Sequence, residues 1–149
     1  MREIAAEIDI EADIAKVWAV LTDFGSYPDW NPFIPSAAGQ LEPGARLRVR
    51  IQPPGARGMT FRPTVMEVDP LHEVRWLGHF VIPGLVDGEH TFTLMPAGER
   101  RVHMVQREVF RGVLVPFLGG MIAATRRGFE EMNRSLKARS EQDTSSQGG

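Results

Sequence analysis

The feature that most constrains the fold is a change of hydrophobic period near residue 112. Between residues 45 and 110, apolar side chains recur mostly at every second position, which is typical of strands with one buried face. After residue 112 they recur at spacings of three and four, as on an amphipathic helix. The expected helical face consists of Leu114, Leu118, Met121, Thr125, Phe129, Met132 and Leu136. Strands followed by one long helix have one compact arrangement, in which the antiparallel sheet curls around the helix.

The first part of the chain adds one more strand and a short helix. Apolar and mostly acidic residues alternate over residues 3–11, and residues 14–21 then follow helical spacing. The next segment, residues 23–35, is rich in aromatic residues and proline and indicates neither helix nor strand. We therefore expect an α+β domain with about six to seven antiparallel strands, one or two short helices after the first strand, and a long C-terminal helix.

Length and composition narrow the domain organisation. A chain of 149 residues suits a single domain, which we assign to residues 1–139. Residues 140–149 are polar and rich in serine and glycine, so we expect a disordered tail there.

Charge and cysteine content exclude several classes of function. The net charge of −2 gives no overall attraction to nucleic acid or to an anionic membrane. Arg46, Arg48 and Arg50 alternate along one strand, and we interpret them as the solvated outer face of a sheet. The chain has no cysteine, which excludes disulfides and suits the cytoplasm, where we expect the protein. No window reaches the ~20 apolar residues of a membrane span, and the first residues lack the apolar core of a signal peptide.

Three polar residues are expected on the inward face of the last two strands. His90 has the parity of Phe92 on one strand, and Gln106 and Glu108 have the parity of Phe110 on the next. A three-residue connecting loop would place His90 opposite Gln106, whereas a five-residue loop would place it opposite Glu108. A carboxylate beside the imidazole would raise the pKa of His90, and the pair could serve as a general acid and base.

A purely structural role for these residues stays open. A buried histidine with one hydrogen-bond partner can be purely structural, and Glu108 could instead pair with Arg111 near the strand end. The histidines show no metal-ligand spacing, and glycine-rich phosphate loops and nucleophile motifs are absent. We therefore expect neither a metal nor a cofactor.

Several segments carry a resemblance to a known superfamily. They are "VWAVLTDFGSYPDWNPFI", "VRWLGHF", "DGEHTFTL", "EVFRGVLVP" and "GFEEMNRSLK". In this order they resemble the START-like, or SRPBCC, superfamily, and most of all its bacterial polyketide cyclase/dehydrase-type members. The resemblance implies the helix-grip fold, with a deep apolar cavity between the curled sheet and the C-terminal helix. Because this fold hosts binding proteins and enzymes alike, it says more about architecture than about function.

The implied cavity gives a set of candidate ligand-binding residues. They are Trp30, Phe33, Phe61, Trp76, Phe80, His90, Phe92, Gln106, Glu108, Phe110, Phe117, Met121 and Phe129. We expect the segment 23–35 to cross one end of the cavity, with the mouth beside Phe117 and Met121 where the long helix begins. His90 and Glu108 are the best catalytic candidates.

The leading hypothesis is a protein that binds a small hydrophobic or aromatic, lipid- or polyketide-like molecule. The alternatives are a polyketide cyclase or dehydratase that uses acid–base chemistry, and a homodimeric interaction module without a ligand.

Overall fold

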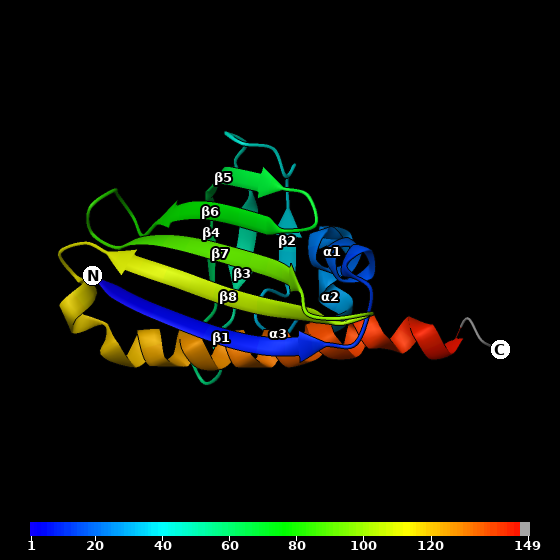
Figure 1. The fold of residues 1–149 in the computed structure, drawn as a ribbon. Helices are drawn as coiled ribbons and strands as arrows, with labels where there is room; N and C mark the ends of the chain where they lie inside the picture. The colour runs from blue at the N-terminus through cyan, green and yellow to red at the C-terminus, as the bar shows by residue number, and fades with distance from the viewer. Residues whose placement is uncertain (147–149) are drawn as a thin grey trace.

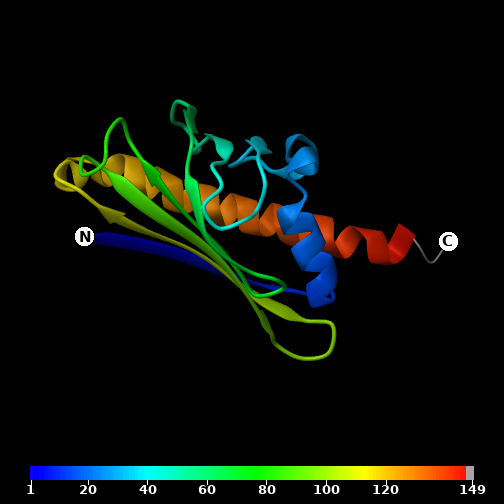
Figure 2. The ribbon, with the colours of Figure 1, turned by 90° about the horizontal axis from the view of Figure 1, so that it is seen from above.

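The computed structural model describes residues 1–146. A curved antiparallel sheet lies along one side of the long helix α3 (Gly119–Ser146), and a second, smaller sheet stands across its open side (Figures 1 and 2). The strands are β1 (Arg2–Ile10), β2 (Ser36–Ala38), β3 (Arg48–Ile51), β4 (Met59–Phe61), β5 (Thr64–Asp69), β6 (Glu73–His79), β7 (Asp87–Pro96) and β8 (Val102–Arg111). The other helical elements are α1 (Ile14–Thr22), α2 (Tyr27–Trp30) and the 3₁₀ turns η1 (Phe24–Ser26) and η2 (Val115–Phe117). The predicted α+β helix-grip architecture is confirmed.

The sheet is divided, which differs from the single sheet that the sequence predicts. Five strands follow the order β1-β8-β7-β6-β5, and three more follow the order β2-β3-β4. The strands β4 and β5 are separated at Pro63, which has no N–H to donate to a ladder. Residues 44–47, just before β3, pair with residues 63–65 through the Arg46–Thr64 bridge and backbone hydrogen bonds such as that from the Leu47 N–H to the Pro63 carbonyl at 2.8 Å. The break lets the chain turn sharply and close a space over α3.

The long helix begins later and ends later than predicted. Residues 115–117 form a 3₁₀ turn, and the α-helix starts at Gly119. It continues to Ser146, past the predicted domain end at residue 139, and Ser140 is fully buried. Glu141 explains part of this extension, because its carboxylate accepts a hydrogen bond from the Glu11 backbone N–H at 2.7 Å. Residues 147–149 of the predicted tail lie outside the described part of the chain.

The aromatic segment 23–35 is more regular than its sequence suggests, since it holds η1 and α2. Tyr27 is fully buried, and its hydroxyl donates a hydrogen bond to the Leu21 carbonyl. The Asn31 side-chain oxygen accepts from the backbone N–H groups of Phe33 at 3.1 Å and of Ile34 at 2.8 Å. The Asn31 side chain thus stabilises a turn, and the segment is part of the core rather than a loose flap.

The buried apolar residues form one core between the two sheets and α3. Its centre includes Ile10, Phe33, Phe92, Phe129 and Met132, all nearly inaccessible to solvent. Along residues 1–146, no helix combines the length and the apolar character needed to cross a bilayer.

Candidate functional site

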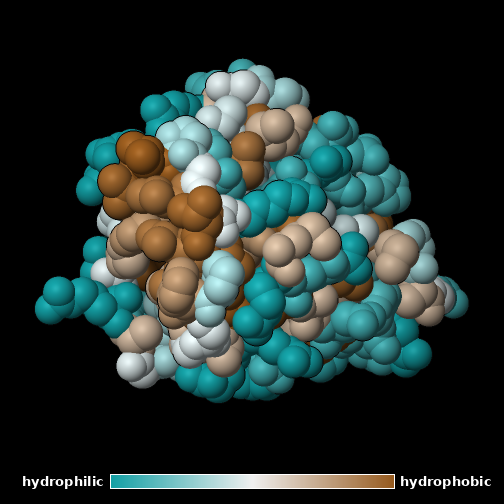
Figure 3. Space-filling view, turned by 90° about the vertical axis from the view of Figure 1, so that its left-hand side faces the viewer, coloured by the Kyte–Doolittle hydropathy of each residue, from teal (hydrophilic) through white to brown (hydrophobic). Residues whose placement is uncertain are grey.

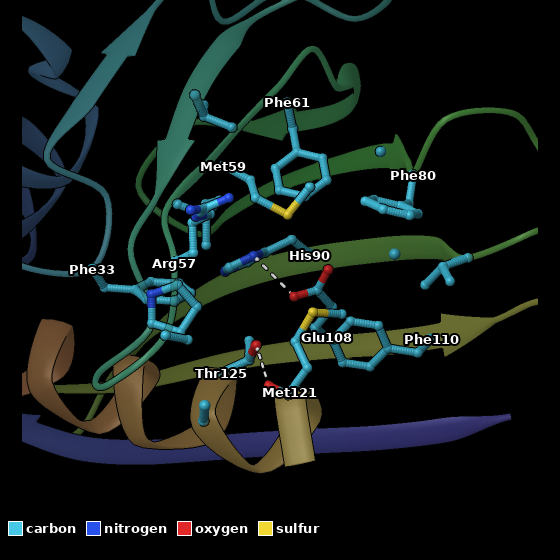
Figure 4. Close-up of a pocket in the computed structure, with 18 of the residues that line it drawn as sticks. Phe33, Arg57, Met59, Phe61, Phe80, His90, Glu108, Phe110, Met121 and Thr125 are labelled. Carbon is cyan, nitrogen blue, oxygen red and sulfur yellow. Dashed lines mark hydrogen bonds and ion pairs between the residues drawn. The ribbon is translucent and has the colours of Figure 1, made fainter. Parts of the chain in front are cut away.

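A cavity of about 590 Å³ lies between the curved sheet, the small sheet and the first half of α3 (Figure 4). Its volume falls in the range of small-molecule sites, and its wall is mainly apolar. Most of the predicted ligand-binding residues line it, namely Phe33, Phe61, Trp76, Phe80, His90, Glu108, Phe110 and Met121.

Three predicted residues lie behind the cavity wall instead of lining it. Phe92, Gln106 and Phe129 have the expected inward parity, but each is almost completely buried by its neighbours. Phe92 and Phe129 pack against the His90 ring, with ring centroids 4.5 Å and 5.0 Å away. These two rings therefore support His90 from behind the cavity wall.

Two other predicted residues, Phe117 and Trp30, do not line the cavity. Phe117 is 80% exposed on η2, because the helix does not begin until Gly119 and the apolar face of the helix is not yet formed at residue 117. Trp30 packs against Tyr27 at the end of α2, with ring centroids 5.2 Å apart, and does not reach the cavity.

The position of the segment 23–35 differs from the prediction. The segment 23–35 meets the middle of α3, where Gly128 leaves room for the Phe33 ring. A Cβ at Gly128 would lie only 2.2 Å from Phe33 Cδ1. Met121 lines the cavity near the start of α3, together with Phe80 from the β6–β7 loop and Arg57 from the β3–β4 loop (Figure 4). Phe33 therefore closes one end, beside Arg57, and the start of α3 with the β6–β7 loop borders the mouth at the other end (Figure 4).

Sequence reasoning missed the contribution of the β3–β4 connection and of the middle of α3. Residues 53–57 and Met59 line the cavity, although their turn-like sequence gives no signal for it. Val49 and Ile51 could have been included, because they share the inward parity of a predicted strand. Ala124 and Thr125 line the cavity from α3.

His90 is the most constrained polar group at the wall. Its side chain is 3% exposed, and its ring lies between Phe92, Phe129 and Trp76, whose ring centroid is 5.3 Å away. The Nε2 atom of His90 is 2.9 Å from Oε1 of Gln106. These aromatic contacts and the hydrogen bond fix the orientation of the imidazole.

A chain of hydrogen bonds assigns the tautomer of His90. Gln106 donates from Nε2 to Oδ1 of Asn133 on α3 at 3.0 Å, so its Oε1 faces His90 as an acceptor. The His90 proton therefore lies on Nε2, and Nδ1 keeps a free lone pair. Sequence reasoning missed Asn133, a buried amide one turn beyond Phe129 on the helix face that meets the sheet.

Glu108 stands beside the free nitrogen. The loop of residues 97–101 places His90 opposite Glu108 and Phe92 opposite Gln106, the register predicted for a five-residue loop. Glu108 Oε1 is 3.6 Å from His90 Nδ1, which is longer than a hydrogen bond. Gly88 makes the space for this carboxyl group, because a Cβ there would lie 2.3 Å from Glu108 Oε2. Glu108 thus points into the cavity and not toward Arg111.

Burial makes both members of this pair neutral. It lowers the pKa of His90 to about 4 and raises the pKa of Glu108 to about 8. The expectation that Glu108 would raise the pKa of His90 is wrong, because desolvation outweighs the attraction of a group that is itself protonated. At pH 7 the wall therefore presents a carboxylic acid that can donate a proton and an imidazole nitrogen that can accept one.

The remaining histidines lie on the surface. His103 contacts Glu7 at 2.6 Å and Asp9 at 2.8 Å, and His79 contacts Asp87 at 2.7 Å. Across residues 1–146, no group of three or more histidine or acidic side chains is arranged to hold a metal ion.

Comparison with known proteins gives one family and many similar folds. The family model described as "Polyketide cyclase / dehydrase and lipid transport" matches residues 1–141. No curated protein matches the chain in sequence.

Three similar solved structures are an aromatase/cyclase, a START superfamily protein and a protein from Thermus thermophilus. The Zhui aromatase/cyclase of Streptomyces sp. R1128 has a TM-score of 0.80 and 18% identity, with 99% of this chain and 98% of that chain covered. The START superfamily protein of Mycobacterium smegmatis has a TM-score of 0.73 and 20% identity, with 94% and 97% covered. The Thermus thermophilus protein TTHA0849 has a TM-score of 0.71 and 18% identity, with 93% and 97% covered. At these identities the likeness shows the fold.

Proposed function

Because this chain belongs to the polyketide cyclase / dehydrase and lipid transport family, we propose that it binds a small, uncharged, hydrophobic or aromatic molecule in the cavity over α3. The observation that carries the proposal is the Glu108–His90 pair at the wall of an otherwise largely apolar space of about 590 Å³. The absence of cysteine suits a cytoplasmic location, which we also propose.

The neutral pair defines the chemistry of the ligand. An ionised ligand group placed against His90 and Glu108 would leave water and gain no counter-ion from this pair, since both side chains are uncharged at pH 7. A carbonyl or hydroxyl oxygen would instead accept a hydrogen bond from protonated Glu108, and a hydroxyl could also donate to Nδ1 of His90. Aromatic residues such as Trp76, Phe61 and Phe110 would contact the apolar body of the ligand.

Native mass spectrometry of the freshly purified protein tests this proposal. We expect the protein to carry one small neutral molecule, or to take one up from a panel of apolar aromatic ketones and phenols. Gly88→Ala should weaken binding by about tenfold, because the new Cβ displaces the Glu108 carboxyl group. Gly119→Ala, whose Cβ would meet nothing within 4 Å, is the matched control. Equal affinity of the two variants would contradict the role of Glu108.

The same pair supports an enzyme as the second candidate function. In the dehydration of a β-hydroxy carbonyl compound, His90 Nδ1 would take the proton from the carbon next to the carbonyl. Glu108 would protonate the departing hydroxyl, so that water leaves and a carbon–carbon double bond forms. The products at the wall would be an imidazolium and a carboxylate 3.6 Å apart, and one proton transfer between them would restore the neutral pair.

Two substitutions separate binding from catalysis. His90→Ala removes the base, and we expect it to abolish turnover while the protein still binds the ligand. Glu108→Gln keeps the shape and a hydrogen-bond donor but loses the transferable proton, so turnover should fall by at least about a hundredfold. Unchanged turnover in His90→Ala would leave ligand binding alone as the function.

A further inference from the structure

One end of the molecule exposes an apolar surface around the cavity mouth. Figure 3 shows apolar residues gathered on this end, which lies at the left in Figure 1. The surface is made by Val81, Ile82, Val113, Leu114, Phe117 and Met121, and we call it the mouth patch. Phe117 is 80% exposed and Val81 is 77% exposed, which is costly in water unless the patch has a partner.

The mouth patch has a fixed backbone. Its two loops are tied together by hydrogen bonds from the N–H of Val113 to the Gly84 carbonyl and from the N–H of Leu114 to the Leu85 carbonyl, both 3.1 Å long. Gly112 permits the contact, because a Cβ there would lie 2.3 Å from the Leu85 oxygen and its φ is +134°. The backbone groups of the loops are thus partly paired internally, while the large apolar side chains face outward.

Apart from Asp87, the charged side chains that directly flank the two apolar stretches of the mouth patch are arginines. Residues 80–86 and 112–125 contain no charged side chain, and Arg111, Arg126 and Arg127 flank the second stretch. Among the described residues, neither Arg111 nor Arg126 forms an ion pair. Asp87 follows the first stretch, but its carboxylate already contacts His79 and accepts from the Gly84 N–H at 3.1 Å. The patch is therefore apolar at its centre and cationic at its edge.

We propose that the mouth patch docks this protein onto a bilayer surface that carries anionic headgroups. Two apolar loops projecting from one end suit insertion among lipids, and the arginines suit contact with lipid phosphates. A symmetric contact between two copies would instead bring these arginines against one another. The net charge of −2 concerns the whole chain and does not oppose this local attraction.

The position of the patch gives docking a consequence for the cavity. Met121 belongs both to the mouth patch and to the cavity lining, and Phe80 lines the cavity beside Val81. A docked molecule would hold its mouth against the acyl region, so that an apolar compound could enter without crossing water. Docking itself does not depend on which compound the cavity holds.

Vesicle flotation with the purified full-length protein tests the proposal. We expect it to float with phosphatidylcholine vesicles that contain about 30% phosphatidylglycerol, and to bind vesicles of pure phosphatidylcholine much more weakly. The double variant Val113→Ser/Phe117→Ser should reduce the partition coefficient by at least about tenfold. The control Met66→Ser/Met95→Ser removes two side chains that are exposed outside the patch and should bind as the native protein does. Each of Arg111→Gln and Arg126→Gln should reduce binding about fivefold at low salt.

Three results would overturn the proposal. The protein fails to float with anionic vesicles, or it binds uncharged vesicles equally well, or the patch variant floats like its control. Light scattering tests the alternative that the mouth patch binds a second copy of the chain. A native dimer that Val113→Ser/Phe117→Ser converts to a monomer would make the patch a contact between copies and overturn the proposal. Thermal unfolding of each variant confirms that loss of binding is not loss of the fold. If the double variant unfolds, Phe117→Ser alone and the salt dependence of the native protein still decide the matter.

Discussion

Replacing Glu108 with glutamine tests whether the carboxyl group at the cavity wall is protonated in the folded protein. Its pKa is raised by burial from an ordinary value of 4.5 to about 8. Between these two pH values the folded state binds one proton more than the unfolded state. The free energy of unfolding therefore falls as the pH rises, and it levels off above pH 8. Glutamine cannot ionise, so Glu108→Gln should lack this loss.

The size of the change in the free energy of unfolding follows from the pH range in which Glu108, and not His90, changes its protonation. Burial lowers the pKa of His90 from 6.5 to about 4, so His90 contributes the opposite slope, but only below pH 6.5. From pH 6.5 to pH 8 only Glu108 changes, at about 1.4 kcal/mol per pH unit. The native protein should lose about 2 kcal/mol relative to Glu108→Gln across this window.

Urea unfolding monitored by tryptophan fluorescence at several pH values measures this difference. His103 must be considered, because hydrogen bonds to Asp9 and Glu7 raise its pKa and give stability that is also lost as the pH rises. It is present in both proteins and cancels when the native protein is compared with Glu108→Gln. Parallel stability profiles from pH 6.5 to pH 8.5 would refute the claim that Glu108 is held protonated.

The other predictions concern the packing and the hydrogen bonds that support the cavity wall. Gly128→Ala should lower the free energy of unfolding by about 1–3 kcal/mol, because its Cβ would lie 2.2 Å from Phe33 Cδ1. Gly119→Ala should leave the free energy of unfolding unchanged or slightly raised. Equal urea midpoints for Gly128→Ala and Gly119→Ala would contradict the close packing of Phe33 against Gly128. Asn133→Ala should cost about 1–3 kcal/mol by leaving the buried Gln106 amide without its acceptor. Urea unfolding of Asn133→Ala measures this loss of stability, and a loss near zero would show that the Gln106 amide has another hydrogen-bond acceptor.

Much of the architecture follows from hydrophobic period and strand parity. The change of period near residue 112 predicts a sheet and a helix that must pack on each other. Alternation on β7 and β8 predicts that His90 and Glu108 face inward, and the length of the hairpin loop fixes them opposite each other. Each of these features depends on residues close together in the chain, so one sequence is enough to predict it.

The features that sequence reasoning missed depend on tertiary arrangement. Phe117 is expected where the long helix begins and close to the ligand, yet it precedes the true start of α3 and is exposed. Arg57 and Met59 reach the cavity because the small sheet packs across α3, an arrangement that their own turn-like sequence does not indicate. The pKa of His90 was predicted in the wrong direction, since its value depends on burial depth, which periodicity does not measure.

The most direct test of the central claim is the titration of the protein with an uncharged, apolar aromatic fluorophore. The native protein should bind one molecule with micromolar affinity. Ala124→Trp, which projects an indole into the cavity from α3, should weaken binding by more than about tenfold. Ala123→Trp, on the neighbouring exposed position, should bind as the native protein does, and Ala124→Phe provides a smaller obstruction if the tryptophan variant is unstable. Equal affinity for the native protein and both cavity variants would contradict the claim that the space over α3 is the binding site.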